Sequence, residues 1–122
     1  MKDNRKQTGN EGENRASDYL EAHGFTVLNR NWATRTGEID IIAYKAQMIV
    51  FVEVKTLPSG TPEMIAHVVD RRKQQKIIKT AKCFLSIHRE YNESYVRFDV
   101  IVVDMPGFLP VYHIENAFSE FL

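Results

Sequence analysis

Four charged residues interrupt a stretch that is otherwise rich in β-branched and aromatic residues. Glu38 and Asp40 lie in its first half, Glu53 and Lys55 lie in its second half, and a polar Lys-Ala-Gln break separates the halves. Residues 37–55 therefore predict a β-hairpin. With a two-residue loop, Asp40 lies opposite Glu53 and Glu38 lies opposite Lys55, at Cβ separations of roughly 5 Å. Two carboxylates that close repel each other, so a cation should compensate them.

The residue types around this pair point to hydrolytic chemistry at a metal ion. Asp40 and Glu53 offer hard oxygen ligands, which favour Mg²⁺ or Mn²⁺ over zinc. Such a cation lowers the pKa of a bound water and neutralises phosphate charge, while Lys55 would orient that water or stabilise charge in the transition state. Cys83 is single, the four histidines are scattered, and the glycine-rich motifs of nucleotide-binding folds are absent from the sequence, so no nucleotide cofactor is expected.

A simpler interpretation places the acids in water at the strand ends, with Glu38 and Lys55 as a cross-strand ion pair. The second strand argues against it, because Val50 and Val52 on one face and Phe51 on the other make both of its faces apolar. A strand that is apolar on both faces is covered on both sides. Its charges then lie at the rim of a covered sheet, where the sites of α/β proteins are commonly found.

A helix over residues 10–23 should bring a third acid to the same region. Glu13 lies one turn before Ala16 on the apolar stripe of this helix, and Gly24 suits its C-terminal stop. Gly12 has no side chain and permits a close approach of the helix to the sheet. The alternative is that Glu13 only complements the positive N-terminal end of the helix dipole.

A second helix, expected from residue 62 or 69 to residue 88, carries a strongly basic outer face. No acid interrupts this run of lysines and arginines after Asp70. A solvated helix usually mixes charges of both signs, so a phosphate-facing surface and a merely solvated face both remain open. The candidate nucleic-acid contacts are Arg72, Lys73, Lys76 and Lys79 on this helix, with Arg30 and Arg35 ahead of the hairpin.

The order of elements predicts the fold class. Further strands are expected at residues 25–32, 95–104 and 110–114, and a terminal helix at residues 115–121. Helix, three strands, helix, two strands and helix indicate an α/β fold with a central mixed sheet of about five strands, flanked by helices on both faces. Residues 1–8 are expected to form a flexible N-terminal tail, and residues 9–122 a single domain.

The composition limits the class of protein and its partners. The chain has 122 residues, of which 43% are hydrophobic and 26% charged, with a formal net charge of zero. Without a global basic field, nucleic-acid binding must come from a local patch. The single Cys83 excludes an internal disulfide, and neither a secretory signal nor a membrane span is found, so a cytoplasmic location and no membrane partner are expected.

Several short motifs carry a family resemblance. Asp40 followed by Glu53-Val54-Lys55 resembles the PD-(D/E)XK nuclease signature. The fuller set is Gly9-x-x-Gly12-Glu13-x-x-Ala16, Asn31-Trp32, Gly37-Glu38-Ile39-Asp40, Phe51-Val52-Glu53-Val54-Lys55-Thr56 and Arg97-Phe98-Asp99-Val100. Together these motifs resemble the YraN family of small bacterial proteins over nearly the whole chain.

This resemblance implies a restriction-endonuclease-like fold akin to archaeal Holliday-junction resolvases. It implies metal ligation by Asp40 and Glu53, a helix acid at Glu13 and a catalytic lysine at Lys55. All three acids are then expected around one Mg²⁺ or Mn²⁺, with Glu13 acting directly or through a water. One departure is Leu57, which stands where the family commonly has an arginine and removes one expected phosphate contact.

Two functions from different classes remain open. The first is a metal-dependent endonuclease that acts on branched or flapped DNA, or on RNA, with DNA favoured. The second is a non-catalytic nucleic-acid-binding or scaffold protein that retains the nuclease fold. The complete acid and lysine set favours the first, whereas the zero net charge and Leu57 favour the second. The oligomeric state is undetermined, with a homodimer among the alternatives.

Overall fold

The computed structural model describes residues 4–56, 69–104 and 110–120 of the chain. One five-stranded sheet forms its centre, in the order β1-β2-β3-β4-β5. Within these described ranges, β3 and β4 are the only parallel pair, and the other neighbouring strands are antiparallel. The elements are α1 (Asn4–Ala22), β1 (Thr26–Thr34), β2 (Gly37–Lys45), β3 (Met48–Thr56), α2 (Arg71–Ile87), the 3-10 turn η2 (Arg89–Tyr91), β4 (Tyr95–Val103) and β5 (Val111–Phe118).

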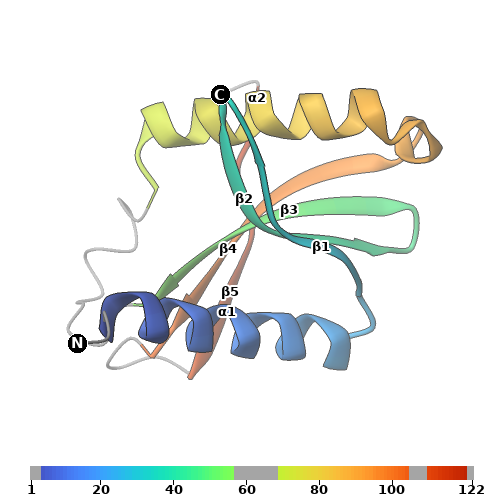
Figure 1. Ribbon diagram of the computed structural model, residues 1–122. Coiled ribbons are helices and arrows are strands. Elements are labelled where there is room, and N and C mark those ends of the chain that lie inside the picture. The colour runs from blue at the N-terminus through green and yellow to red at the C-terminus, as the bar shows by residue number, and fades with distance from the viewer. Residues whose placement is uncertain (1–3, 57–68, 105–109, 121–122) are drawn as a thin grey trace.

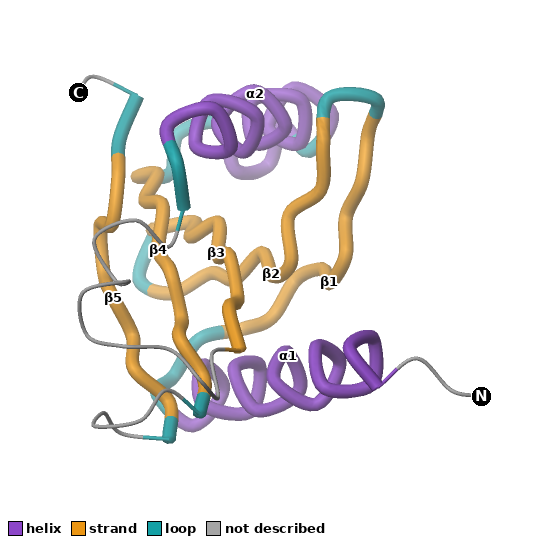
Figure 2. Tube along the Cα trace, turned by 90° about the vertical axis from the view of Figure 1, so that its left-hand side faces the viewer, coloured by secondary structure: helices purple, strands orange, loops and turns teal. Residues whose placement is uncertain are grey.

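The sheet lies between the two helices, with α1 on one face and α2 on the other (Figure 1; Figure 2). Because side chains alternate along a strand, β3 sends Phe51 into the α2 layer and Val50 and Val52 into the α1 layer. Phe84 of α2 and Leu20 of α1 are both fully buried against these faces. The predicted α/β fold, with a mixed five-stranded sheet covered on both faces, is confirmed, and it is consistent with a restriction-endonuclease-like fold.

Local sequence signals mark the C-terminal end of α1 and the N-terminal end of α2. At the end of α1, Gly24 has φ +88°, and Phe25 N–H donates to Leu20 O at 3.0 Å, as in a Schellman cap. The predicted stop is therefore confirmed. The predicted start is wrong, since α1 already begins at Asn4 and includes most of the expected tail. Asp70 caps α2 by accepting a hydrogen bond from Lys73 N at 2.8 Å. No helix among the described residues has the length and hydropathy to cross a membrane.

The predicted C-terminal helix is wrong, because β5 continues as the edge strand as far as Phe118. Three contacts between β5 and β4 explain the extended chain. Phe118 stacks on Phe98 of β4 with ring centroids 5.3 Å apart, and Asn116 N–H donates to Asp99 at 2.9 Å. Asp99, fully buried, also binds Arg97 and His113, so one carboxylate ties β4 to β5.

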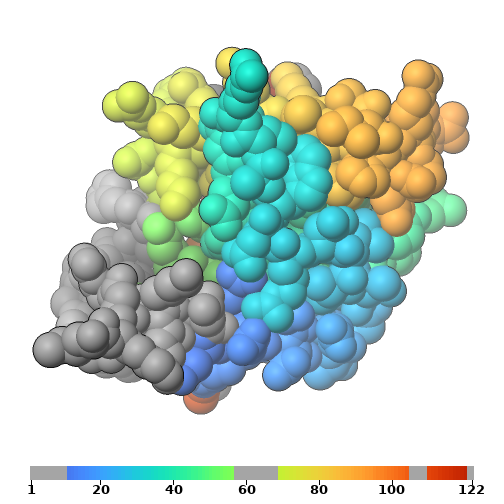
Figure 3. Space-filling model, viewed as in Figure 1, coloured from blue at the N-terminus to red at the C-terminus, as the bar shows by residue number. Residues whose placement is uncertain are grey.

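The far end of the β1–β2 hairpin curls away from the sheet and lies over α2. In Figure 3 this hairpin stands in front of the middle of the helix. A hydrogen bond of 2.9 Å joins the hydroxyls of Thr36 and Thr80. The packing is close, since a Cβ added at Gly37 would lie 3.2 Å from the Thr80 hydroxyl. The hairpin end and the start of α2 therefore enclose the space above the outer ends of β2 and β3.

Candidate active site

The β2–β3 hairpin has the predicted register. Ile41 pairs with Val52 and Lys45 pairs with Met48, so continuing the same register places Asp40 opposite Glu53 on adjacent strands. The loop is the predicted pair Ala46 and Gln47, and both have positive φ, as in a type I′ turn.

Beyond the last paired residues of this hairpin, the Asp40 carboxylate replaces a backbone acceptor. Its Oδ2 accepts a hydrogen bond from Val54 N–H at 2.8 Å. This contact holds the carboxylate beside Glu53 rather than in open solvent. Burial, and next the negative charge of Glu53, raise the pKa of Asp40 from 3.8 to about 7, against the lowering effect of the Val54 hydrogen bond. The region therefore contains more negative charge than it readily accommodates.

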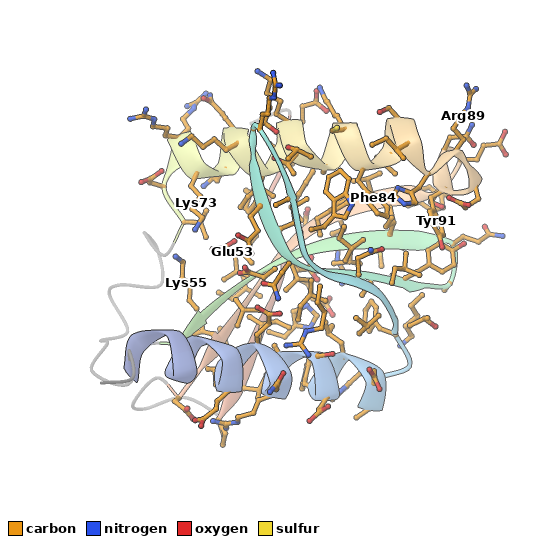
Figure 4. All side chains as sticks on the ribbon, viewed as in Figure 1. Glu53, Lys55, Lys73, Phe84, Arg89 and Tyr91 are labelled. Atoms are coloured by element: carbon orange, nitrogen blue, oxygen red, sulfur yellow. The ribbon has the colours of Figure 1, made fainter. Side chains whose placement is uncertain are left out.

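Glu53 forms ion pairs with two lysines. Its residue surface is only 4% exposed, and its Oε1 lies 2.7 Å from Lys73 Nζ and 3.5 Å from Lys55 Nζ. Figure 4 shows Lys73 reaching down from α2 and Lys55 extending from β3 toward the same acid. Burial lowers the pKa of Lys73, but the hydrogen bond and charge of Glu53 outweigh it and raise that pKa above its ordinary value.

This geometry corrects two sequence-based assignments. Lys73 is expected on the outer basic face of the helix, but its side chain turns toward Glu53. Lys55 has its ion pair with Glu53 on its own strand, and not with Glu38 as the simpler interpretation requires. Strand alternation gives the right face for Lys55, but the sequence does not reveal that a helix lysine would reach the same carboxylate.

Glu13 is brought to the sheet by the close approach of α1. A Cβ added at Gly12 would lie only 2.2 Å from the Thr56 hydroxyl, so the contact of α1 with β3 requires glycine there. Glu13 itself is 7% exposed and accepts hydrogen bonds from Arg30 Nε at 3.0 Å and Asn31 Nδ2 at 2.8 Å. Asn31 has φ 53°, a conformation that asparagine tolerates, and its motif with Trp32 does not by itself indicate this contact with Glu13.

Glu13 does not form one compact cluster with Asp40 and Glu53 in this structure. Its charge contributes to the raised pKa of Asp40, but only after burial and Glu53. Among the described residues, no group of three or more Asp, Glu, His or Cys side chains gathers tightly enough to hold one metal ion. Each acid instead has a partner in the protein: Arg30 for Glu13, Val54 N–H for Asp40 and Lys73 for Glu53.

A pocket of about 540 Å³ opens above Asp40 and Glu53. Its walls come from β2, from Glu53 of β3, from Asp70 and from the first turns of α2. The lining residues are Gly37, Glu38, Asp40, Glu53, Asp70, Arg72, Lys73, Lys76 and Ile77. Of the predicted nucleic-acid contacts, Arg72, Lys73 and Lys76 thus reach the pocket. The basic helix α2 and the acidic β2–β3 hairpin therefore both line this cavity.

The other predicted nucleic-acid contacts do not line this pocket. Lys79 and Arg35 are exposed, whereas the guanidinium of Arg30 is bonded to Glu13 and to Asn14. Farther along the basic face, Lys82 forms an ion pair with Glu120. The run of basic residues in the sequence gives no sign of this acidic partner. Residues 56–62, whose prolines and glycine predict a loop at the mouth of the site, lie outside the described residues except for Thr56.

Asp40 and Glu53 are the two carboxylates here that could serve as ligands of a hard divalent cation. They lie on adjacent strands. Glu53 is almost fully buried, and the pKa of Asp40 is raised by burial and then by the charge of Glu53. Magnesium-like ions take such oxygen donors and complete their coordination with waters. The 2.7 Å contact of the Lys73 ammonium with Glu53 shows that a cation is already accommodated at this place.

Comparison with known proteins gives the family. A family model described as "Uncharacterised protein family UPF0102" matches residues 12–103. A UPF0102 protein of Treponema denticola is 41% identical over 92% of this chain and 95% of its own length. Similar proteins of Treponema pallidum (43%, covering 98% of both chains) and Geobacter metallireducens (44%, covering 93% of both) carry the same family name. The match spans the hairpin, the basic helix and β4, and we conclude that this chain belongs to the UPF0102 family, which is the YraN family that its motifs resemble.

Proposed function

We propose that this protein is a divalent-metal-dependent endonuclease that hydrolyses phosphodiester bonds in nucleic acid. The observation that carries the proposal is the Asp40–Glu53 pair, held on adjacent strands beneath a basic helix, with Lys55 directed at the same acid. Asp40 and Glu53 would hold the Mg²⁺ or Mn²⁺, which when bound supplies an acidified water and neutralises phosphate charge.

Lys55 is the residue we assign to the chemistry. Its ammonium lies 3.5 Å from Glu53 Oε1 and its side chain is 30% exposed, so it lies beside this acid and is still accessible to solvent. A lysine there stabilises the charge that builds on the phosphate in the transition state and orients the attacking water. Glu13 adds negative charge near Asp40 and is oriented by Arg30 and Asn31.

The basic residues of α2 that line the pocket would bind the phosphate backbone of the substrate. Arg72 and Lys76 are exposed and line the cavity, and Lys79 continues the same basic face. With zero net charge, such a local patch must supply the phosphate contacts. We favour DNA over RNA, with branched DNA as the first substrate to test, and a reducing compartment such as the cytoplasm as the setting.

A second candidate is a non-catalytic nucleic-acid-binding or scaffold protein. It is favoured by the protein cations that already neutralise two of the acids, Lys73 for Glu53 and Arg30 for Glu13. A purely binding protein needs no metal, and such ion pairs would then be permanent. The two candidates differ in whether Lys55 acts only in a transition state.

Lys55 variants separate the candidates. An endonuclease should lose a factor on the order of 10² or more in single-turnover cleavage when Lys55→Ala is made, while its substrate binding weakens much less. Lys55→Arg should not restore the rate, because the guanidinium is bulkier and stays protonated. A binding protein would keep its affinity in Lys55→Arg and show no turnover. Equal cleavage rates in wild type and both variants would remove Lys55 from the proposed chemistry.

A further inference from the structure

Lys73 and Lys55 contact the same oxygen of Glu53, but they differ in origin and freedom. Lys55 stands on β3, two residues from Glu53, at 3.5 Å. Lys73 comes from the first turn of α2 and makes the shorter contact, 2.7 Å. Its side chain is 44% exposed although its partner is almost buried, so the ammonium can leave Glu53 without unpacking a core.

The positive charge of the Lys73 ammonium partly offsets the negative charge of Asp40 and Glu53, as a bound metal ion would. Asp40 and Glu53 repel each other, and the charge of Lys73 is among the influences that lower the pKa of Asp40. A monovalent ammonium at 2.7 Å from Glu53 cannot share that oxygen's coordination site with a divalent cation. A divalent cation that takes this oxygen as a ligand would therefore displace the ammonium.

We propose that Lys73 is an exchangeable internal cation, which occupies Glu53 in the metal-free protein and is released into the pocket when a divalent cation binds. Released, it lies on the wall that Arg72 and Lys76 form, where a substrate phosphate would bind. Metal binding and phosphate binding would then strengthen each other through one side chain. This inference rests on the proposed function, because it takes Asp40 and Glu53 as the metal ligands.

The test measures Mn²⁺ affinity by calorimetry for wild type, Lys73→Met and Lys76→Met. Methionine keeps the length of the stem and suits a helix interior. Removing the competing ammonium should tighten Mn²⁺ binding about fivefold or more. Lys76 lines the same pocket and has no ion-pair partner among the described residues, so Lys76→Met should change the affinity by less than about twofold. Lys73→Arg keeps a cation at Glu53 and should bind Mn²⁺ no more tightly than wild type.

The second readout is DNA affinity, measured by anisotropy with Lys55→Ala in every protein so that the DNA stays intact. Mn²⁺ should strengthen DNA binding more in the Lys73 protein than in Lys73→Met. Unchanged or weaker Mn²⁺ binding by Lys73→Met would overturn the inference, as would an equal Mn²⁺ effect on DNA binding.

Failure of the inference is distinguishable from failure of the proposed function. If wild type binds Mn²⁺ in a manner that Asp40→Asn abolishes, the metal site stands, and the Lys73 comparison alone decides the exchange. If neither wild type nor Lys73→Met binds Mn²⁺, both ideas fail. Binding by Lys73→Met alone would give the strongest support for the exchange. Thermal melts of each variant without metal check that all of them fold.

Discussion

The negative charge stored at Asp40 should make the metal-free protein less stable than a variant without it. Asp40→Asn removes the charge but keeps an Oδ1 that can still accept the Val54 N–H bond. An acid with a raised pKa stabilises the fold most below its ordinary pKa, and this contribution is lost as pH rises through the raised value. For Asp40 the window runs from pKa 3.8 to about 7.

The size of the effect follows from that shift in pKa. A tenfold change in proton affinity is worth about 1.4 kcal/mol, so a pKa moved from 3.8 to about 7 costs the folded state at most roughly 4 kcal/mol above pH 7. The asparagine amide also loses water on burial, so we expect Asp40→Asn to be more stable than wild type by about 2 to 4 kcal/mol at pH 8. Near pH 4 the two proteins should differ little, because Asp40 is protonated in the folded state and about half protonated in the unfolded state.

Urea unfolding in EDTA at several pH values between 4 and 8 measures this difference directly. Glu38→Gln is the matched control, since Glu38 is an exposed acid on the same strand and the same pocket, and its change should stay within about 0.5 kcal/mol. A difference between Asp40→Asn and wild type that does not grow with pH, or a variant that is less stable at pH 8, would refute the reasoning that excess negative charge is stored at this position.

Two further predictions concern the helices. Gly12→Ala should destabilise the fold by about 1 to 3 kcal/mol, because the new Cβ would lie 2.2 Å from the Thr56 hydroxyl. Adding Thr56→Ala leaves the next atom at 3.5 Å and should recover this loss in a double-mutant cycle of unfolding free energies, whereas simple additivity of the two changes would contradict the contact. Replacing Arg72, Lys76 and Lys79 together by Gln should weaken duplex DNA binding and reduce the log–log salt slope by about 0.9 per lost phosphate contact, and an unchanged slope would mean that this face is only solvated.

Local sequence signals predict the part of the site that lies on the hairpin. Alternation along two strands and a two-residue loop are enough to place Asp40 opposite Glu53, because a register slip would turn the apolar side chains out of the core. The buried Glu13 is likewise predictable from its position one turn before Ala16. These features depend on neighbours that are close in sequence.

The features that the sequence did not reveal depend on distant contacts. Lys73 reaches Glu53 across 20 positions of chain, and its place in a run of lysines gives no sign of this partner. The C-terminal segment has a weak helical pattern, but Phe118 gains more by stacking on Phe98, and Asn116 by bonding to Asp99. Tertiary packing thus overrides local propensity at the sheet edge.

The central claim is that Asp40 and its neighbours cut nucleic acid with the help of a divalent cation. The most direct test incubates wild type and Asp40→Asn with end-labelled branched, flapped, duplex and single-stranded DNA and RNA, in Mg²⁺, Mn²⁺ or EDTA. Because Asp40→Asn is expected to be the more stable protein, its loss of activity cannot be ascribed to unfolding. We predict cleavage of at least one substrate by wild type that needs the cation and disappears in Asp40→Asn. Cleavage that persists in Asp40→Asn, or a wild type that binds Mn²⁺ and cuts none of these substrates, would contradict the account.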